Sequence, residues 1–113
     1  MNTSGVFGSG FDQLEVGDGF ETEFRTICDE DLTAFSDLTW DHHPLHTDPE
    51  WAAGSPFGSR IAHGMLSASL LSTVFGTRLP GPGCIYLSQT LKFKAPVRIG
   101  DTVVATVTAR EVV

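Results

Sequence analysis

The feature that most constrains the fold is a run without formal charge between Arg60 and Arg78, counting His63 as neutral. Apolar side chains recur along this run at helical spacing and form two stripes. One stripe consists of Ile61, Met65, Ala68 and Phe75, and the other of Leu66, Leu70 and Val74. A helix that is apolar or small nearly all round is buried in a core. We therefore expect a buried helix that begins near Ile61 and a twisted antiparallel sheet that wraps around it.

Segments on both sides of this run predict the sheet. Residues 20–27 alternate phenylalanine and threonine with charged residues, which is the period of a strand. Residues 85–97 carry the strongest pattern, because their apolar side chains share one parity. Residues 102–113 are rich in valine and threonine and alternate again. We expect strands in all three segments.

The remaining segments predict shorter elements within one domain. Acidic residues at 29–31, followed by apolar residues three apart, favour a short helix. Prolines and glycines punctuate residues 47–59, which we expect to be a loop. With 113 residues and 41% hydrophobic content, the chain suits a single α+β domain over residues 1–113. Residues 1–10 are rich in glycine and serine and are expected to be flexible.

Composition limits the partners and the location of the chain. A net charge of −7 argues against nucleic acid, because no basic patch could offset phosphate repulsion. The uncharged run contains too many serines and threonines for a membrane span and is barely long enough. No basic segment precedes an apolar one at the N-terminus, so no signal peptide is visible. Cys28 and Cys84 lack metal or redox spacing, and we interpret them as buried thiols in the reducing cytoplasm.

A cluster of acid and imidazole groups is the candidate site. Three of the four histidines follow one carboxylate, Asp41, within five positions. Asp41 and His46 could place a base and an acid around one reacting centre, on the bend that Pro44 fixes. Most such clusters are solvated turns, and spacing alone leaves both interpretations open. Gly64 favours the interpretation as a catalytic site, since backbone N–H groups at the start of a helix stabilise developing negative charge.

Several motifs in order resemble one known family. They are Asp41-x-x-Pro44-Leu45-His46-x-Asp48-Pro49, Ile61-Ala62-His63-Gly64-Met65-Leu66, and residues 79–87 and 93–101. Together they resemble the MaoC-like (R)-specific enoyl-CoA hydratases (hydratase 2), which have the hot-dog fold. The resemblance extends from about Val16 to Val107. It implies an antiparallel sheet around a central helix, with two strands beyond the point where this sequence stops. We therefore expect either a C-terminally short chain or a partner chain that completes the sheet.

The resemblance also implies a reaction. It is the reversible addition of water to a trans-2-enoyl-CoA, which gives the (R)-3-hydroxyacyl-CoA without a cofactor. Asp41 and His46 match the catalytic pair and would share one water; which of them is the formal base stays open, because coupled groups titrate together. Gly64 matches the residue whose N–H stabilises the thioester enolate. Ser72 matches a family serine that would orient the pair, although helical serines more often bond to their own helix.

Two further histidines, His43 and His63, lie within these motifs. His43 stands where the family motif Asp-x-Asn-Pro-x-His has asparagine. An imidazole offers both a donor and an acceptor only when neutral, so we expect activity to fall more steeply at low pH than in asparagine-bearing relatives. The implied chemistry requires no further imidazole, and we interpret His63 as a packing residue.

Other functions remain open at this point. A (3R)-hydroxyacyl-carrier-protein dehydratase would use the same residues, and a non-catalytic subunit of a heteromeric dehydratase would not need Asp41 or His46. A hot-dog thioesterase is less favoured, because residues 61–77 contain no carboxylate. Zinc could suit the histidines and aspartates at 41–48, but their spacing matches no ligand pattern, so we expect no metal. Arg60 is interpreted as a solvated surface arginine. The favoured prediction is a homodimeric enoyl-CoA hydratase.

Overall fold

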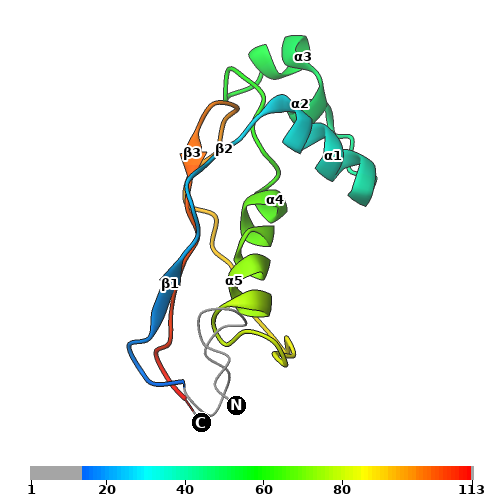
Figure 1. Cartoon of the computed structure of the whole chain (residues 1–113). Coiled ribbons are helices and arrows are strands. Elements are labelled where there is room, and N and C mark those ends of the chain that lie inside the picture. Colours follow the sequence, from blue (N-terminus) through cyan, green and yellow to red (C-terminus); the bar gives the residue numbers. More distant parts are fainter. Residues whose placement is uncertain (1–13, 113) are drawn as a thin grey trace. The chain divides into compact units, whose positions relative to one another are not determined.

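The computed structural model describes residues 14–112, so the segment predicted to be flexible, 1–10, lies outside the described residues (Figure 1). The helices are α1 (Asp29–Thr39), α2 (Pro44–Thr47), α3 (Pro49–Ala53), α4 (Gly64–Ser69) and α5 (Leu71–Thr77). The strands are β1 (Gly19–Glu21), β2 (Arg25–Thr26), β3 (Thr102–Val103) and β4 (Thr106–Thr108). The chain forms two compact units. Among the described residues, the first contains 14–23, 69–91 and 104–112, and the second contains 24–68 and 92–103.

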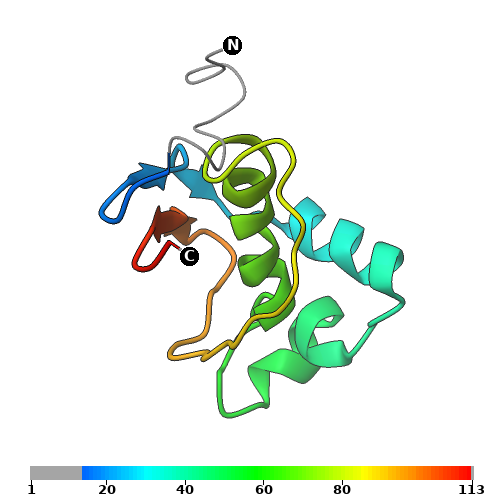
Figure 2. The same cartoon turned by 90° about the horizontal axis from the view of Figure 1, so that it is seen from below.

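The second unit contains the candidate site. Its core consists of Ile27, Leu32 and Ala62, against which Leu66, Val97 and Val103 pack. Strands β2 and β3 pair antiparallel, with Arg25 opposite Val103. A short turn joins α1 to α2 (Figure 2). Asp41, His42 and His43 lie in this turn, and His46 lies in α2.

Helix α1 begins with a capping box at Cys28. The Cys28 N–H donates to Oδ2 of Asp31 at 3.0 Å, and three acidic residues occupy the first turn, where the helix dipole favours them. Cys28 is exposed and Cys84 partly exposed, so the interpretation of both as buried thiols is wrong. The thiol at Cys28 lies outside the core because this residue caps a surface helix.

The first unit has its own small core. Strands β1 and β4 pair antiparallel, with Phe20 opposite Val107. The buried side chains of this core are Val74, Leu79 and Ala105. Partly buried apolar residues pack against them: Leu14, Phe20, Leu70, Leu71 and Val107. The predicted strands at 20–27 and 102–113 are thus present, but each is divided into two short pieces.

The strand predicted over residues 85–97 is wrong. This segment is irregular throughout, and Ile85 and Leu87 are 78% and 90% exposed. Side-chain alternation is not sufficient for a strand, because its N–H and C=O groups also need a hydrogen-bonded partner strand. Residues 14–112 offer none to this segment.

The uncharged run forms helices as predicted, but they are less buried than expected. Helix α4 begins at Gly64, three residues later than predicted, and Leu70 separates it from α5. No residue of α4 is buried, and in α5 only Val74 is. The expected burial is wrong for this chain because the segment that should wrap the helix forms no sheet. Among the described helices, none is long and apolar enough to cross a membrane.

The loop predicted at 47–59 contains helix α3. Asp48 caps it, accepting from the N–H groups of Glu50 at 3.0 Å and Trp51 at 3.2 Å. Pro49 follows as the first helical residue, a position that tolerates proline because its N–H would be unbonded there anyway. Pro49, which indicated a loop, therefore starts a short helix.

Candidate active site

Three side chains from separate segments converge in the second unit. One carboxylate oxygen of Asp41 and one ring nitrogen each of His46 and His63 lie within 4.8 Å of one another. Asp41 is exposed, His46 is half-buried and His63 is buried. The separation allows one water to bond both Asp41 and His46 at about 2.8 Å. The structure therefore brings together the two residues predicted to form the pair.

The end of α1 sets the direction of Asp41. Trp40 closes the helix in the left-handed conformation, with φ 66°, and turns the chain away from the helix axis. This conformation costs a non-glycine residue about 1–2 kcal/mol and is held by its surroundings. Two hydrogen bonds hold Asp41, the residue that follows Trp40. The Asp41 N–H donates to Thr39 Oγ1, and Asp41 Oδ1 accepts from the His43 N–H, each at 3.3 Å.

The tautomer of His46 follows from its backbone partner. Its Nδ1 lies 2.8 Å from the carbonyl oxygen of Ile61. A carbonyl only accepts, so Nδ1 carries the proton and Nε2 keeps a lone pair when the ring is neutral. His46 therefore has one nitrogen fixed by the fold and one nitrogen able to take a proton.

His43 caps the helix that carries His46. Its Nδ1 accepts the N–H of Leu45 at 3.0 Å, and its ring packs edge-on against Trp51 with centroids 5.3 Å apart. A side-chain oxygen of asparagine would accept the same bond. The effect on activity predicted for His43 can therefore act through the shape of α2, and the cap explains how imidazole replaces the family asparagine.

Because His43 caps α2, we expect its replacement by asparagine to change how activity depends on pH. Protonation turns the Nδ1 of His43 into a donor and removes the cap, whereas an asparagine amide keeps it. We expect the activity of the wild type to fall more steeply toward acidic pH than that of the variant, by up to about fivefold, the factor that a lost cap worth about 1 kcal/mol would give. The measurement is kcat against pH. His42→Asn, on an exposed neighbour, should keep the wild-type profile; an unchanged profile in His43→Asn would contradict the idea.

Gly64 borders an apolar cleft. It is the first residue of α4, and no acceptor for its N–H is present in the described part of the chain. A Cβ at this position would lie 3.0 Å from the Phe93 ring. The cleft has a volume of about 580 Å³ and is lined by residues of the second unit. Its lining includes Phe57, Ile61, Met65, Val97 and both lysines of the chain, Lys92 and Lys94.

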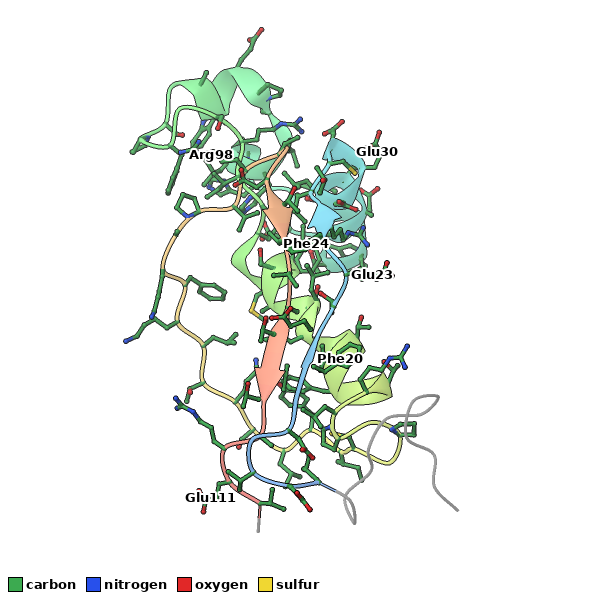
Figure 3. All side chains as sticks on the ribbon, turned by 60° about the vertical axis from the view of Figure 1, so that its left-hand side comes forward. Phe20, Glu23, Phe24, Glu30, Arg98 and Glu111 are labelled. Atoms are coloured by element: carbon green, nitrogen blue, oxygen red, sulfur yellow. The ribbon has the colours of Figure 1, made fainter. Side chains whose placement is uncertain are left out.

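The structure also describes Ser72 and Arg60. Ser72 lies in α5 of the first unit, and its role stays a prediction. Arg60 is not a solvated arginine: its side chain is 17% exposed, and Nη1 lies 2.6 Å from Oδ1 of Asp29. Arg98, labelled in Figure 3, is similarly engaged, donating to the Phe57 carbonyl at 2.6 Å and to Ser59 Oγ at 2.5 Å.

Sequence reasoning missed Ser36 and undervalued His63. Both are buried, and Ser36 Oγ lies 3.0 Å from His63 Nε2. A signal was present: Ser36 follows Leu32 by four positions, so it shares the buried face of α1 although it is polar. Nothing in the sequence links it to a residue 27 positions away.

The same cluster is a poor metal site. The rings of His46 and His63 are stacked, with centroids 3.8 Å apart and an angle of 23° between their planes. Ligand lone pairs lie in the ring plane, so two nearly parallel rings cannot direct them at one ion at about 2.1 Å from each. The remaining candidates in the 41–48 segment, His42, His43 and Asp48, do not join the cluster.

Comparisons with known proteins identify the family of this chain. The family described as "MaoC like domain" matches residues 12–112. The chain is 58% identical over 84 residues to an (R)-specific enoyl-CoA hydratase of Rhodospirillum rubrum, covering 74% of this chain and 58% of that protein. It is 50% identical over 105 residues to a 3-hydroxybutyryl-CoA dehydratase of Methylorubrum extorquens, covering 91% of this chain and 65% of that protein.

A solved structure shows the same architecture. Unliganded R-hydratase PhaJ1 from Pseudomonas aeruginosa superposes with a TM-score of 0.83 at 43% identity, over 90% of this chain and 65% of that one. The chain thus spans less than two thirds of the length of all three proteins. The predicted α+β class and hot-dog fold are confirmed. The chain belongs to the MaoC-like domain family.

Proposed function

We propose that this chain carries the active site of an (R)-specific enoyl-CoA hydratase. The observation that carries the proposal is the convergence of Asp41 and His46 to within 4.8 Å, with Nδ1 of the imidazole fixed by a carbonyl. Two ionisable groups at this separation can hold one water and exchange protons with it. The names of the two sequence relatives support a CoA thioester over a carrier-protein thioester as substrate.

The proposed reaction has three requirements. The shared water loses a proton to the pair as its oxygen bonds to the β-carbon of the enoyl thioester. A proton then passes from the pair to the α-carbon, on the same face. Negative charge on the thioester oxygen is stabilised by the N–H of Gly64, which has no acceptor among the residues described. The apolar cleft beside Gly64 offers space for an acyl chain.

The test is hydration of a short trans-2-enoyl-CoA, followed as loss of the conjugated-thioester absorbance. The wild-type chain should hydrate it, and a variant without the Asp41 carboxylate should not. A folded wild-type chain without activity would contradict the proposal. Faster turnover of a carrier-protein-linked acyl chain, at equal acyl length, would favour the dehydratase alternative. Wild-type activity in an Asp41-deficient chain within a complex would identify a non-catalytic subunit.

We also propose that the chain works as a homodimer. Large apolar side chains are exposed in each unit, among them Ile85 and Leu87 in the first and Met65 and Phe93 in the second. Exposed apolar surface of this kind favours association. Dimerisation links stability to concentration, so the midpoint of thermal unfolding should rise with chain concentration. A midpoint that does not move would count against the dimer. Location in the cytoplasm stays a prediction.

A further inference from the structure

His63 is a buried polar residue that contacts both members of the pair. Its ring is 3% exposed and packs against Phe35 of α1, with centroids 4.8 Å apart. On its other side it stacks on His46 at 3.8 Å. Its Nε2 lies 3.2 Å from the backbone oxygen of Asp41 and 3.0 Å from Ser36 Oγ. A packing residue would need none of these polar partners.

The partners fix the proton of His63. The Asp41 carbonyl can only accept, so Nε2 carries the proton and donates it. Nδ1 then keeps a lone pair, which is buried and has no partner within residues 14–112. A second proton there would be a buried donor without an acceptor. Burial lowers the pKa of His63; the nearby His46 and His42 lower it further, while the Asp41 backbone and carboxylate oppose the shift.

The contacts of His63 hold Asp41 and His46 independently of each other. Asp41 precedes Pro44, and His46 follows it in α2, so the local chain does not fix their separation by itself. The N–H bond from His63 holds the Asp41 backbone, and the neutral ring face holds the plane of His46. Ser36, on the buried face of α1, shares the Nε2 proton and connects this contact to the core.

We propose that His63 is a positioning residue for the reacting pair and that Ser36 supports it. The inference rests on the proposed hydratase function and adds to it the device that sets the distance between Asp41 and His46. His63 touches no substrate in this scheme. It acts through the geometry of two other residues, where a displacement of about 1 Å can cost about 100-fold in rate.

Two substitutions of His63 separate its two contacts. His63→Phe keeps a ring face for His46 but loses the donor to Asp41, whereas His63→Gln keeps an amide donor and loses the ring. We expect kcat for enoyl-CoA hydration to fall about 100-fold in the Phe variant and about tenfold in the Gln variant, because the lost donor holds the backbone that carries the Asp41 carboxylate. KM should stay within about twofold, since the substrate is not contacted. Ser36→Ala, the mildest change, should lower kcat a few fold.

The outcomes decide the proposal. In an Asp41→Asn background, His63→Phe should add little further loss, because residues that act as a unit are not additive. Folded Phe and Gln variants with wild-type kcat, or with changes in KM alone, would overturn it. If the wild-type chain hydrates nothing, the proposed function fails, and the imidazole ¹⁵N spectrum decides the positioning role instead. His46 should show the Nδ1–H tautomer in the wild type. In His63→Gln the stacked ring is lost, so the His46 ring should turn, its bond to the Ile61 carbonyl should weaken, and a mixture of tautomers should appear; identical spectra would overturn the inference.

Discussion

Asp41→Asn is expected to lower kcat for enoyl-CoA hydration by about three orders of magnitude. Asparagine can still hold the water by a hydrogen bond, but it cannot take the proton that the water must lose, and positioned acid–base groups contribute about 10²–10⁴-fold. The local fold should persist, because the asparagine oxygen can accept the His43 N–H as Asp41 Oδ1 does. KM should change little. The measurement is the initial rate of absorbance loss over a range of substrate concentrations.

A matched control separates chemistry from charge. Asp37 is an exposed carboxylate of α1 whose Oδ1 lies 3.8 Å from His42, outside the reacting pair. Asp37→Asn removes the same charge from the same segment and should keep wild-type kcat. Circular dichroism of both variants checks that the fold is retained. An Asp41→Asn enzyme within tenfold of the wild type, with Asp37→Asn unchanged, would show that the carboxylate does not transfer a proton.

The part of the site that could be predicted is the part encoded locally. Asp41 and His46 are five residues apart on a proline bend, so sequence spacing is enough to suggest that they meet. Their convergence in the structure agrees with this. The contacts of His63 with Ser36 and with the Asp41 backbone span 27 and 22 positions. No spacing rule reaches that far, because such contacts depend on how α1 packs in the core.

The difference between local and long-range contacts also explains which predictions of the fold are wrong. The sequence predicts strands at 20–27 and 102–113, yet only the structure shows that strands of these two segments pair with each other. Residues 85–97 carry a stronger alternation and form no strand, because pairing depends on a partner that the sequence pattern cannot supply. Pro49 indicated a loop, but directly after a capping aspartate it starts a helix instead.

Gly64→Pro is expected to lower kcat about 10²–10³-fold, which is the usual cost of losing one oxyanion donor. Proline has no N–H, so the variant removes the group proposed to stabilise the thioester enolate. We expect the helix to accommodate the change. Gly64 is the first residue of α4, where proline is favoured, and the His63 carbonyl accepts the first helical bonds, from Leu66 at 3.0 Å and Ser67 at 3.4 Å. The thermal midpoint should therefore stay near that of the wild type.

Gly64→Ala is the control that isolates the N–H from the added carbon. Any Cβ at this position meets the Phe93 ring at 3.0–3.2 Å, and the ring is 59% exposed, so it can move by the few tenths of an ångström required. Alanine keeps the N–H and should keep most of the activity. If both variants lose activity equally, crowding against Phe93 is the cause. If the proline variant shows a raised KM with an unchanged kcat, the proline ring hinders substrate binding. Only a loss in kcat confined to proline supports the backbone of Gly64 as the group that receives the enolate charge.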